Sequence, residues 1–286
     1  MDKGENIERI TAMKTYKIKE FAKNIGVTEK TLRHYEKFKI VEPSVNKSNG
    51  YRSYNFRDAE RILASKRFSN MEFSVKETSL LLSESSIDEV ISMFRKQQKR
   101  LEEKALQMHL VTERMKELEE ELRWFKEGPN RGFMHEGKEW WFIKHVSNTQ
   151  FVKDKESLAI IRKMMDVLPC SVKMMPLPEE PEKGRECIWG MAIEPRYAQK
   201  LGIDFKEPMV KFPAALCHYY PAVISGRKER DLEGGQDVPY VWREIKKELK
   251  GRGLSVSGIP YAIGSIDSFS GEKREKHFLF CTPVSC

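Results

Sequence analysis

The sequence lacks long apolar runs, and this absence excludes one class of protein. No stretch of its 286 residues approaches the roughly 20 consecutive apolar residues of a membrane-spanning helix, so we do not expect a membrane protein. Residues 1–12 have no apolar segment of the kind that export signals carry, which predicts a cytoplasmic protein. The hydrophobic content of 40% still allows a real core, and the length suits about two domains.

Cysteine is scarce, and its spacing excludes a second class. The five cysteines are separated by 17, 30, 64 and 5 residues, which matches neither a zinc site nor an iron–sulfur site: Cys170, Cys187, Cys217, Cys281 and Cys286. We therefore expect no metal, no cofactor and no disulfide framework. The sequence also lacks a recognisable Ser/His/acid or paired-carboxylate constellation, so no catalytic residue is predicted and we do not expect an enzyme.

Two short helical patterns meet at Gly26. Apolar residues lie on one face of the first pattern, and others lead into the second: Ile18, Phe21, Ala22 and Ile25, then Val27 and Leu32. The turn of a helix-turn-helix often needs a residue that tolerates positive φ, and glycine does. Thr28 can cap the second helix by accepting a bond from a backbone N–H near Thr31.

A hairpin signal follows this helix pair. Asn49-Gly50 lies between Val45 and Tyr51 and is a strong two-residue turn signal. Residues 1–82 carry a net charge of +6, out of +8 for the whole chain. A local basic excess is the electrostatic footprint of phosphate binding. We therefore expect Arg52 to contact a phosphate.

Three motifs in order resemble the winged helix-turn-helix of MerR-family transcription regulators: Ile18-Lys19-Glu20-Phe21-Ala22, Leu32-Arg33-His34-Tyr35-Glu36 and Gly50-Tyr51-Arg52-Ser53-Tyr54. The resemblance implies contact with double-stranded promoter DNA from Thr28, Lys30, Thr31, Arg33, His34, Tyr35, Tyr51, Arg52 and Lys66. The family more often has Tyr where this chain has His34. Some of these side chains could equally be packing or surface residues, and that alternative stays open.

Residues 87–125 contain neither glycine nor proline and predict one long helix, following a further helix pair in which Ser74 caps the second member. Apolar or tolerated residues recur in heptad steps, with one slip of phase after Met115: Ile87, Ile91, Phe94, Gln98, Leu101, Ala105, Met108, Thr112, Met115, Leu118, Leu122 and Phe125. Such a helix is roughly 58 Å long and cannot hide this stripe alone. The family resemblance implies an antiparallel coiled coil with a second copy, hence a homodimer on a palindromic site. The alternative is a helix that packs on its own domain.

The second half of the chain changes in composition and predicts mixed α and β structure. Strands are expected at residues 140–146, 187–193, 210–220, 261–266 and 277–284, and helices at 154–168 and 239–250. The order strand, helix, strand, strand occurs twice and suggests an internal duplication. We therefore predict an α+β protein with residues 1–13 as an unstructured extension, 14–82 as the DNA-binding domain, 83–127 as the dimerisation helix, 128–132 as a linker and 133–286 as a ligand-binding domain.

Residues 132–284 resemble the GyrI-like effector-binding domain, through Tyr240-Val241-Trp242-Arg243 and Gly258-Ile259-Pro260-Tyr261. The resemblance implies a small-molecule effector. Members that bind cationic drugs place a glutamate after the matching tyrosine, but Ala262 stands here, so cation selectivity does not carry over. Glu194 is an alternative carboxylate, unless it is a solvated strand end. The expected ligand-binding residues are Trp140, Trp141, Trp189, Glu194, Tyr219, Tyr261 and Phe278.

Together the two resemblances imply a ligand-responsive regulator in the bacterial cytoplasm, associated with the nucleoid. It would bind a promoter as a homodimer and, when an aromatic or lipophilic molecule binds, twist or kink the spacer DNA so that RNA polymerase can engage. Two alternatives stay open. One is a repressor or architectural DNA binder without an effector, and the other is a small-molecule hydrolase activity in the C-terminal domain.

Overall fold

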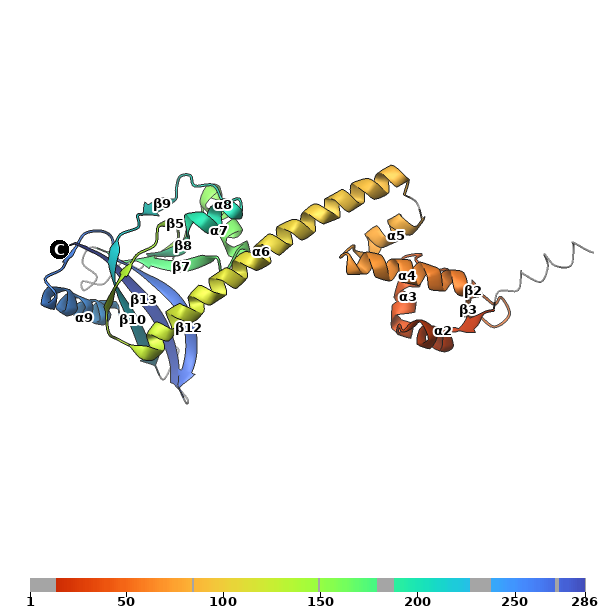
Figure 1. The fold of residues 1–286 in the computed structure, drawn as a ribbon, viewed down its shortest axis with the longest axis horizontal. Helices are drawn as coiled ribbons and strands as arrows, with labels where there is room; N and C mark the ends of the chain where they lie inside the picture. The colour runs from red at the N-terminus through yellow and green to blue at the C-terminus, as the bar shows by residue number, and fades with distance from the viewer. Residues whose placement is uncertain are drawn as a thin grey trace, which may run out of the picture. The chain divides into compact units, whose positions relative to one another are not determined.

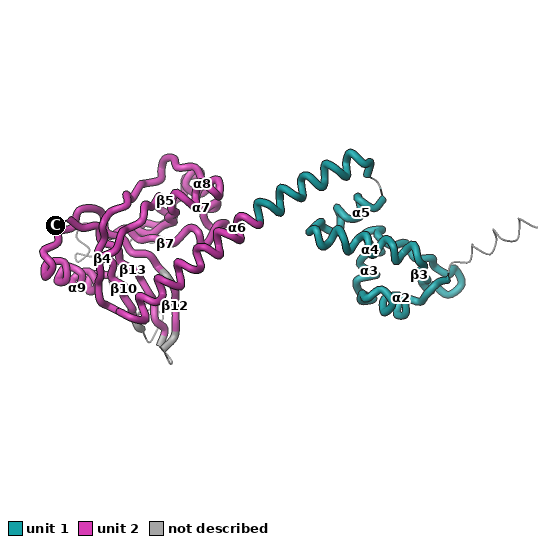
Figure 2. The backbone as a smooth tube through the Cα atoms, in the orientation of Figure 1, with its two compact units in different colours: residues 1–104 teal, residues 105–286 magenta. Residues whose placement is uncertain are grey.

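The computed structural model describes residues 14–83, 85–148, 150–178, 188–226, 238–270 and 273–285. It divides into two compact units, Met1–Lys104 and Ala105–Cys286 (Figure 2). The boundary falls inside one continuous helix, α6 (Ile87–Glu127). The expected extension at residues 1–13 lies outside the described residues.

Unit 1 is a helical domain with a small sheet (Figure 1). Its elements are β1 (Tyr16–Lys17), α2 (Ile18–Ile25), α3 (Glu29–Lys37), β2 (Ser44–Val45), β3 (Arg52–Tyr54), α4 (Phe56–Asn70), α5 (Val75–Ser83) and the first part of α6. The strands pair antiparallel in the order β1-β3-β2. Phe21, Leu32 and Tyr54 are buried together in one core between these elements.

The local signals of the helix pair are confirmed. Gly26 ends α2 at φ +68°, in the left-handed region that glycine tolerates. The Thr28 hydroxyl caps α3 by accepting a hydrogen bond from the Thr31 backbone N–H at 3.0 Å. Ser74 caps α5 in the same way, accepting from the Glu77 backbone N–H at 3.3 Å.

The hairpin is confirmed, but its two-residue turn is wrong. Strands β2 and β3 are joined by residues 46–51, and Gly50 has φ +68°. The Gly50 N–H donates to the Asn46 carbonyl at 2.8 Å, and the Asn46 side chain accepts from the Ser48 N–H at 2.9 Å. The Asn46 side chain therefore organises a longer loop than the Asn49-Gly50 signal predicted.

The expected long helix is confirmed as α6. However, its buried side chains do not simply follow the predicted heptad seam. Ile87, Met108 and Met115 on the seam are 72%, 62% and 61% exposed. Leu110, off the seam, and Phe125, at its end, are buried in the core of unit 2. The alternative of a helix that packs on its own domain is thus correct for the C-terminal part of α6, while the exposed stripe leaves room for a partner helix.

Unit 2 is built on one antiparallel sheet with two similar sets of elements (Figure 1). The first set is β5 (Trp140–Ser147), α7 (Lys155–Asp166), β7 (Ser171–Pro176) and β8 (Ile188–Ile193). The second is β10 (Leu216–Gly226), α9 (Val238–Gly251), β12 (Tyr261–Ser270) and β13 (Lys273–Ser285). The central strand order β10-β13-β12-β7-β8-β5 runs through the same pattern from either end. This symmetry supports the proposed duplication.

Some elements of unit 2 were not expected. The predicted strand 210–220 is two strands, β9 (Val210–Phe212) and β10, which pair with different neighbours on either side of Pro213. Strand β7 completes the first set, and its Lys and Met residues carry little strand signal. The short helix α8 (Pro195–Lys200) and the strands β4 (Phe133–Glu136), β6 (Gln150–Phe151) and β11 (Ser255–Val256) were also missed.

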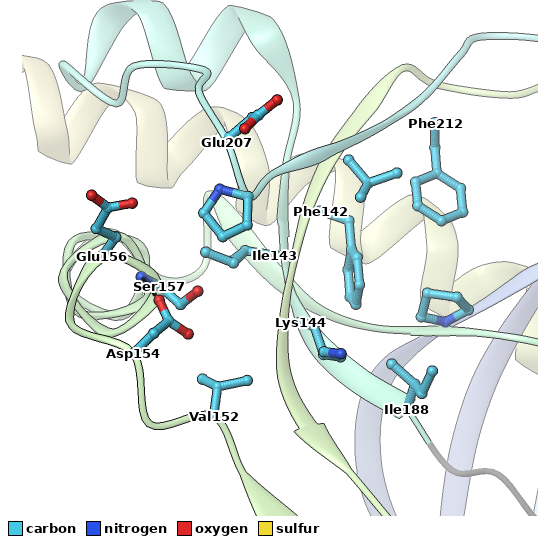
Figure 3. A pocket seen from close by; sticks show the side chains of 13 residues that line it. Phe142, Ile143, Lys144, Val152, Asp154, Glu156, Ser157, Ile188, Glu207 and Phe212 are labelled. Atoms are coloured by element: carbon cyan, nitrogen blue, oxygen red, sulfur yellow. Dashed lines mark hydrogen bonds between the residues drawn. The ribbon is translucent and has the colours of Figure 1, made fainter.

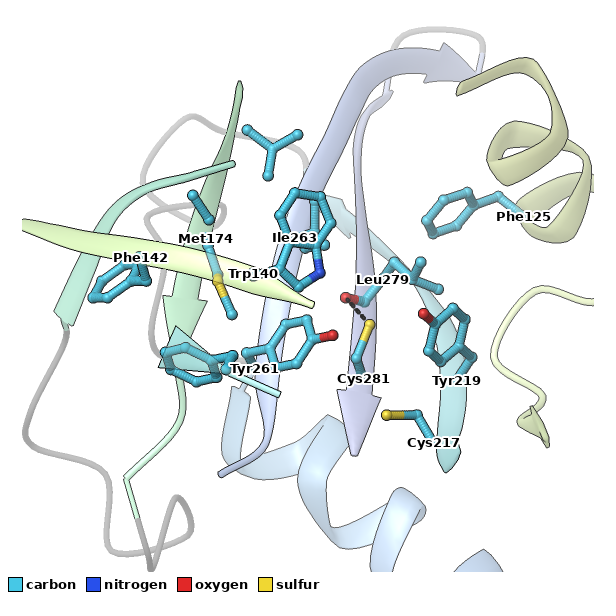
Figure 4. Close-up of a cluster of buried hydrophobic side chains, with 13 residues drawn as sticks. Phe125, Trp140, Phe142, Met174, Cys217, Tyr219, Tyr261, Ile263, Leu279 and Cys281 are labelled. Atoms are coloured by element: carbon cyan, nitrogen blue, oxygen red, sulfur yellow. Dashed lines mark hydrogen bonds between the residues drawn. The ribbon is translucent and has the colours of Figure 1, made fainter. Parts of the chain in front are cut away.

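Three clusters of buried side chains hold unit 2 together. Helix α7 packs Ile161 and Met164 against the strands of the first set, and α9 packs Trp242 and Ile245 against those of the second. The remaining cluster is rich in aromatic side chains (Figure 4). It includes Met174 of β7, a strand in the middle of the sheet. Three of the expected ligand-binding residues belong to this cluster.

Candidate DNA-binding and ligand-binding sites

Helix α3 presents a basic face. Lys30, Arg33, His34 and Lys37 are exposed, while Leu32 is buried on the opposite face. This separation follows from the helical period of 3.6 residues, which places the apolar positions toward the core. The exposed row consists of long donors and one imidazole, the groups that reach phosphates and base edges.

Thr28 and Thr31 lie at the N-terminal end of the same helix. Their hydroxyl groups form a hydrogen bond of 2.8 Å, and Thr28 is exposed. The helix N-terminus carries a partial positive charge and unpaired backbone N–H groups, which favour a phosphate nearby. Lys66 is exposed on α4, where nothing in the described residues occludes it.

Tyr35 does not share this exposed face. Its side chain is 7% exposed and packs in the core of unit 1, which corrects the expectation that Tyr35 contacts DNA. Position 35 falls one helical turn after Thr31 and three residues after Leu32, on the inner face of α3. We therefore leave Tyr35 out of the candidate interface and assign it to packing.

The hairpin of β2 and β3, residues 44–54, is the wing, and an ion pair with no signal in the sequence ties it to α3. Arg52 Nε donates to Glu36 Oε2 at 2.9 Å, and the Tyr54 hydroxyl also donates to Glu36. Burial and this hydrogen bond raise the pKa of Tyr54 far above its usual range. Arg52 keeps 49% of its side chain exposed, and Tyr51 on the loop is 69% exposed, so both can still face a ligand.

Arg61 on α4 supports the other end of α3. Its Nε donates to the Ile40 carbonyl at 2.7 Å and its Nη2 to the Lys39 carbonyl at 3.1 Å. Lys39 has φ +54°, and these bonds satisfy the carbonyls of that strained turn. The partners lie more than 20 residues apart in sequence, and no local pattern signals the contact.

Trp140, Tyr219 and Tyr261 lie together in the aromatic cluster of unit 2 (Figure 4). They are 2%, 4% and 2% exposed, and Phe212 packs on Tyr261 with ring centres 5.7 Å apart. Burial raises the pKa of both tyrosines far above the usual range. The end of α6 contributes Phe125 to the same cluster. Three of the seven expected ligand-binding residues are thus brought together, and they are enclosed.

The other expected aromatic residues lie elsewhere in unit 2. Trp141 stacks on Phe205 at 4.5 Å, because alternation along β5 turns it away from Trp140. Trp189 packs on His145 with ring centres 5.2 Å apart. Phe278 packs with the cluster beneath α9. Within the described part of the chain, the seven residues therefore lie at several separate places rather than around one pocket.

Glu194 is buried rather than solvated, so the alternative of a solvated strand end is wrong. Its carboxylate is 8% exposed and accepts from Arg196 Nε at 2.9 Å and from Lys138 Nζ at 3.2 Å. Glu194 is the N-cap residue that precedes helix α8, and its side chain makes no capping hydrogen bond to the helix. Its charge is already balanced by two cations, which leaves no uncompensated carboxylate to attract a ligand.

Glu117 of α6 joins the same group of charges. Lys138 Nζ lies 3.1 Å from its Oε2, Arg196 pairs with its Oε1, and the Tyr197 hydroxyl donates to Oε1 at 3.1 Å. Burial raises the pKa of Glu117, but the two cations outweigh burial and lower it to about 2. No local pattern in the sequence marks Glu117, Lys138, Arg196 or Tyr197 as members of a site.

Arg114 extends this group one turn along α6. Its side chain is 1% exposed, and its Nη1 lies 2.9 Å from Glu117 Oε2 and 2.8 Å from Glu121 Oε1. Three cations and three carboxylates, from α6, the segment before β5 and α8, thus form one balanced network. We call it the α6 charge network; its members are Arg114, Glu117, Glu121, Lys138, Glu194 and Arg196. It fastens the C-terminal part of α6 to unit 2.

A cavity of about 640 Å³ opens beside the aromatic cluster (Figure 3). Phe142 and Phe212 line it and also belong to the cluster. Its remaining walls combine aliphatic side chains, one lysine and three carboxylates: Ile143, Lys144, Val152, Asp154, Glu156, Ile188, Glu207 and Val210. None of the seven expected ligand-binding residues lines it. Pockets of this size hold small organic ligands.

Within the described residues, no group of three or more His, Cys, Asp or Glu side chains is placed to hold a metal ion. No helix in the same set combines the length and apolarity needed to cross a membrane.

The fold and exposed basic face of unit 1 define a winged helix-turn-helix DNA-binding domain. Residues 16–85 match the family described as MerR HTH family regulatory protein. Residues 16–85 therefore form a MerR-type helix-turn-helix region, and the match does not extend to the rest of the chain.

Curated relatives agree with this assignment. A probable heavy metal-dependent transcriptional regulator of Haemophilus influenzae is 36% identical over 66 residues, which cover 23% of this chain and 52% of that protein. The multidrug-efflux transporter 2 regulator of Bacillus subtilis is 26% identical over 100 residues, or 35% of this chain and 34% of that one. The chain thus spans about half the length of the first relative it matches, and a third of the second. A cryo-EM structure of an EcmrR–DNA complex aligns with 94% of this chain and 99% of its own, at 16% identity and a TM-score of 0.34.

Proposed function

We propose that the chain is a transcription regulator that binds promoter DNA through α3 and the wing. The observation that carries this proposal is the exposed row of Lys30, Arg33, His34 and Lys37 on α3, within a domain of the MerR family. Thr28, Thr31, Tyr51, Arg52 and Lys66 complete the proposed interface. Base edges in the major groove would meet α3, and phosphates would meet the wing.

We further propose that it acts as a homodimer through α6. Leu101, Met108 and Met115 recur in heptad steps, and the two methionines are more than 60% exposed. An exposed apolar stripe of this kind is stable in water when a second helix covers it. A two-fold dimer would then bind a palindromic site.

The effector would enter the cavity beside Phe142 and Phe212. Three carboxylates and one lysine in its lining favour a ligand that is both lipophilic and positively charged. A relative named for regulating a multidrug-efflux transporter is in keeping with a small-molecule effector. The predicted residues Trp140, Tyr219 and Tyr261 would not contact the ligand. They would form the packed layer behind Phe142 and Phe212, against which the cavity wall moves.

Activation would follow from a shift between two conformations. Phe125 links the aromatic cluster to α6, so a ligand that repacks Phe142 and Phe212 can bias the end of this helix. Bending or twisting promoter DNA costs roughly 1 to 6 kcal/mol. A ligand contributes only its difference in affinity between the two states. We therefore expect RNA polymerase contacts to supply part of the energy, and a protein of this kind to work on the bacterial nucleoid in the cytoplasm.

Binding and transcription tests separate the alternatives. The probe is 2-naphthylmethylammonium, a flat aromatic cation. Glu207→Gln should weaken its binding, whereas Asp204→Asn, an exposed neighbour outside the cavity, should not. In vitro transcription from a promoter that the protein selects should rise with the probe while operator affinity changes little. Equal transcription with and without the bound probe would favour a repressor or an architectural protein, and turnover of the probe would favour a hydrolase.

A further inference from the structure

A second cavity, of about 560 Å³, lies where α6 ends. Its wall comes from the last turn of α6, the following residues 128–132, strand β4 and the end of α9. The side chains that matter are Trp124, Glu127, Arg131, Phe133, Met134 and Arg252. None of them was expected to bind a ligand, and none lines the cavity of Figure 3.

One side of this cavity is aromatic. The rings of Trp124 and Phe133 lie 5.2 Å apart at 66°, and both side chains remain partly exposed. Tyr219 packs behind Trp124 at 5.8 Å and holds the indole in place. A partly exposed indole with a fixed orientation offers a flat surface on which another ring can stack.

The other side is cationic. Arg131 is exposed, and its guanidinium has no hydrogen-bond or ion-pair partner among the residues that the structure describes. Arg252 donates Nη2–H to the Gly132 carbonyl at 2.9 Å and keeps further N–H donors. Glu127 is the one carboxylate in the described lining, so the two arginines leave a net positive charge.

The backbone between these groups is held firmly. The Gly132 N–H donates to Glu248 Oε2 at 3.1 Å, and the Asn130 N–H donates to the Pro221 carbonyl at 2.8 Å. A Cβ at Gly132 would lie 2.1 Å from the buried His218 ring, so only glycine allows this approach. The cavity wall is therefore preformed, which reduces the entropy that a ligand must overcome.

We propose that this cavity binds an aromatic anion, with its ring against Trp124 and Phe133 and its carboxylate between Arg131 and Arg252. Guanidinium groups bind carboxylates through paired, charge-assisted hydrogen bonds, and the aromatic wall selects a flat ring. The site is distinct from the proposed effector cavity, whose carboxylates favour the opposite charge. Its ligand would contact both the last turn of α6 and the segment that follows it.

Isothermal titration of the full-length protein with 2-naphthoate tests the proposal. Arg131→Gln should weaken binding about tenfold, because one charge-assisted contact is lost. Glu127→Gln should tighten binding, since it removes the opposing carboxylate. Arg162→Gln, at an exposed arginine on α7 outside the cavity, is the matched control and should leave affinity unchanged. Arg131 is exposed and without a described partner, so its replacement should not disturb folding, and a thermal melt checks this.

The outcomes separate this site from the proposed function. No binding of 2-naphthoate, equal affinity in wild type and Arg131→Gln, or equal binding of 2-naphthylmethylammonium at this site would each overturn the proposal. Glu207→Gln should affect the cation alone. Operator binding, measured separately, should survive Arg131→Gln, so a failure of the DNA-binding proposal would show in a different assay.

Discussion

Replacing Glu117 with Gln should destabilise unit 2 in a pH-dependent manner. Glu117 faces Lys138 and Arg196 in the α6 charge network, and its pKa falls from an ordinary 4.5 to about 2. Each tenfold change in proton affinity is worth about 1.4 kcal/mol, so the shift corresponds to roughly 3 kcal/mol. Because its partners are coupled and partly exposed, we expect about 1 to 3 kcal/mol at pH 7.

The pH dependence has a definite sign. The folded protein holds the ionised carboxylate, so this stabilisation is complete above pH 4.5 and is lost as the pH falls toward 2. Wild type and Glu117→Gln should therefore differ at pH 7 and converge in acid. Glu120→Gln, at an exposed neighbour on α6, is the control and should resemble wild type at both ends.

Urea unfolding followed by tryptophan fluorescence suits this measurement. All five tryptophans lie in unit 2, so the signal reports that unit alone: Trp124, Trp140, Trp141, Trp189 and Trp242. If Glu117→Gln unfolds at the same urea concentration as Glu120→Gln at pH 7, the network does not fasten α6 and the reasoning is refuted.

Three further predictions concern other parts of the chain. Arg33→Ala should weaken binding to a selected operator by about 1 to 3 kcal/mol without changing the melting temperature. The control Lys99→Ala should leave operator binding unchanged, and equal losses of affinity in the two variants would remove α3 from the interface. Met108→Glu should convert the dimer to a monomer by light scattering, because it places an unpaired charge in the proposed helix pair; a persisting dimer would place the interface elsewhere. Burial lowers the pKa of His218 despite its hydrogen bond to Glu248, so the stability of the protein should fall as the pH drops below 6.5. In thermal melts, His218→Gln should reduce this pH dependence of the melting temperature. An unchanged pH dependence would contradict the prediction.

Local patterns were sufficient to predict much of the DNA-binding unit. Gly26 and Thr28 mark the turn and the cap, and both act within four residues along the chain. Periodicity predicted α6, α7 and α9 because the apolar face of a helix appears in the sequence as apolar residues spaced three and four positions apart. The same patterns missed the Asn46 loop and merged β9 and β10 into one strand at residues 210–220, since side-chain bonds and strand partners also decide where a turn falls.

Prediction of the ligand-binding region was weaker for a physical reason. Aromatic type alone does not say which face of a strand a residue occupies, so Trp140 and Trp141 were assigned together although the sheet separates them. By sequence Glu194 fits either a ligand-binding carboxylate or a solvated strand end, because the sequence does not show that Lys138 and Arg196 pair with it. Tyr35 belongs to the same family motif as Arg33 and His34, so the motif alone suggests a DNA contact. The sequence does not show that Arg33 and His34 are exposed while Tyr35 is buried.

The sequence by itself determined the presence of the longer helices, the basic charge of the N-terminal unit and its family motifs, because these depend on neighbours within a few residues. Only the tertiary structure decided which charges are compensated and which surfaces enclose a cavity. Glu117 and Arg196 lie 79 residues apart, and Gly132 meets Glu248 across 116. Contacts at such separations exist only once the sheet has formed, because chain folding alone brings those residues together.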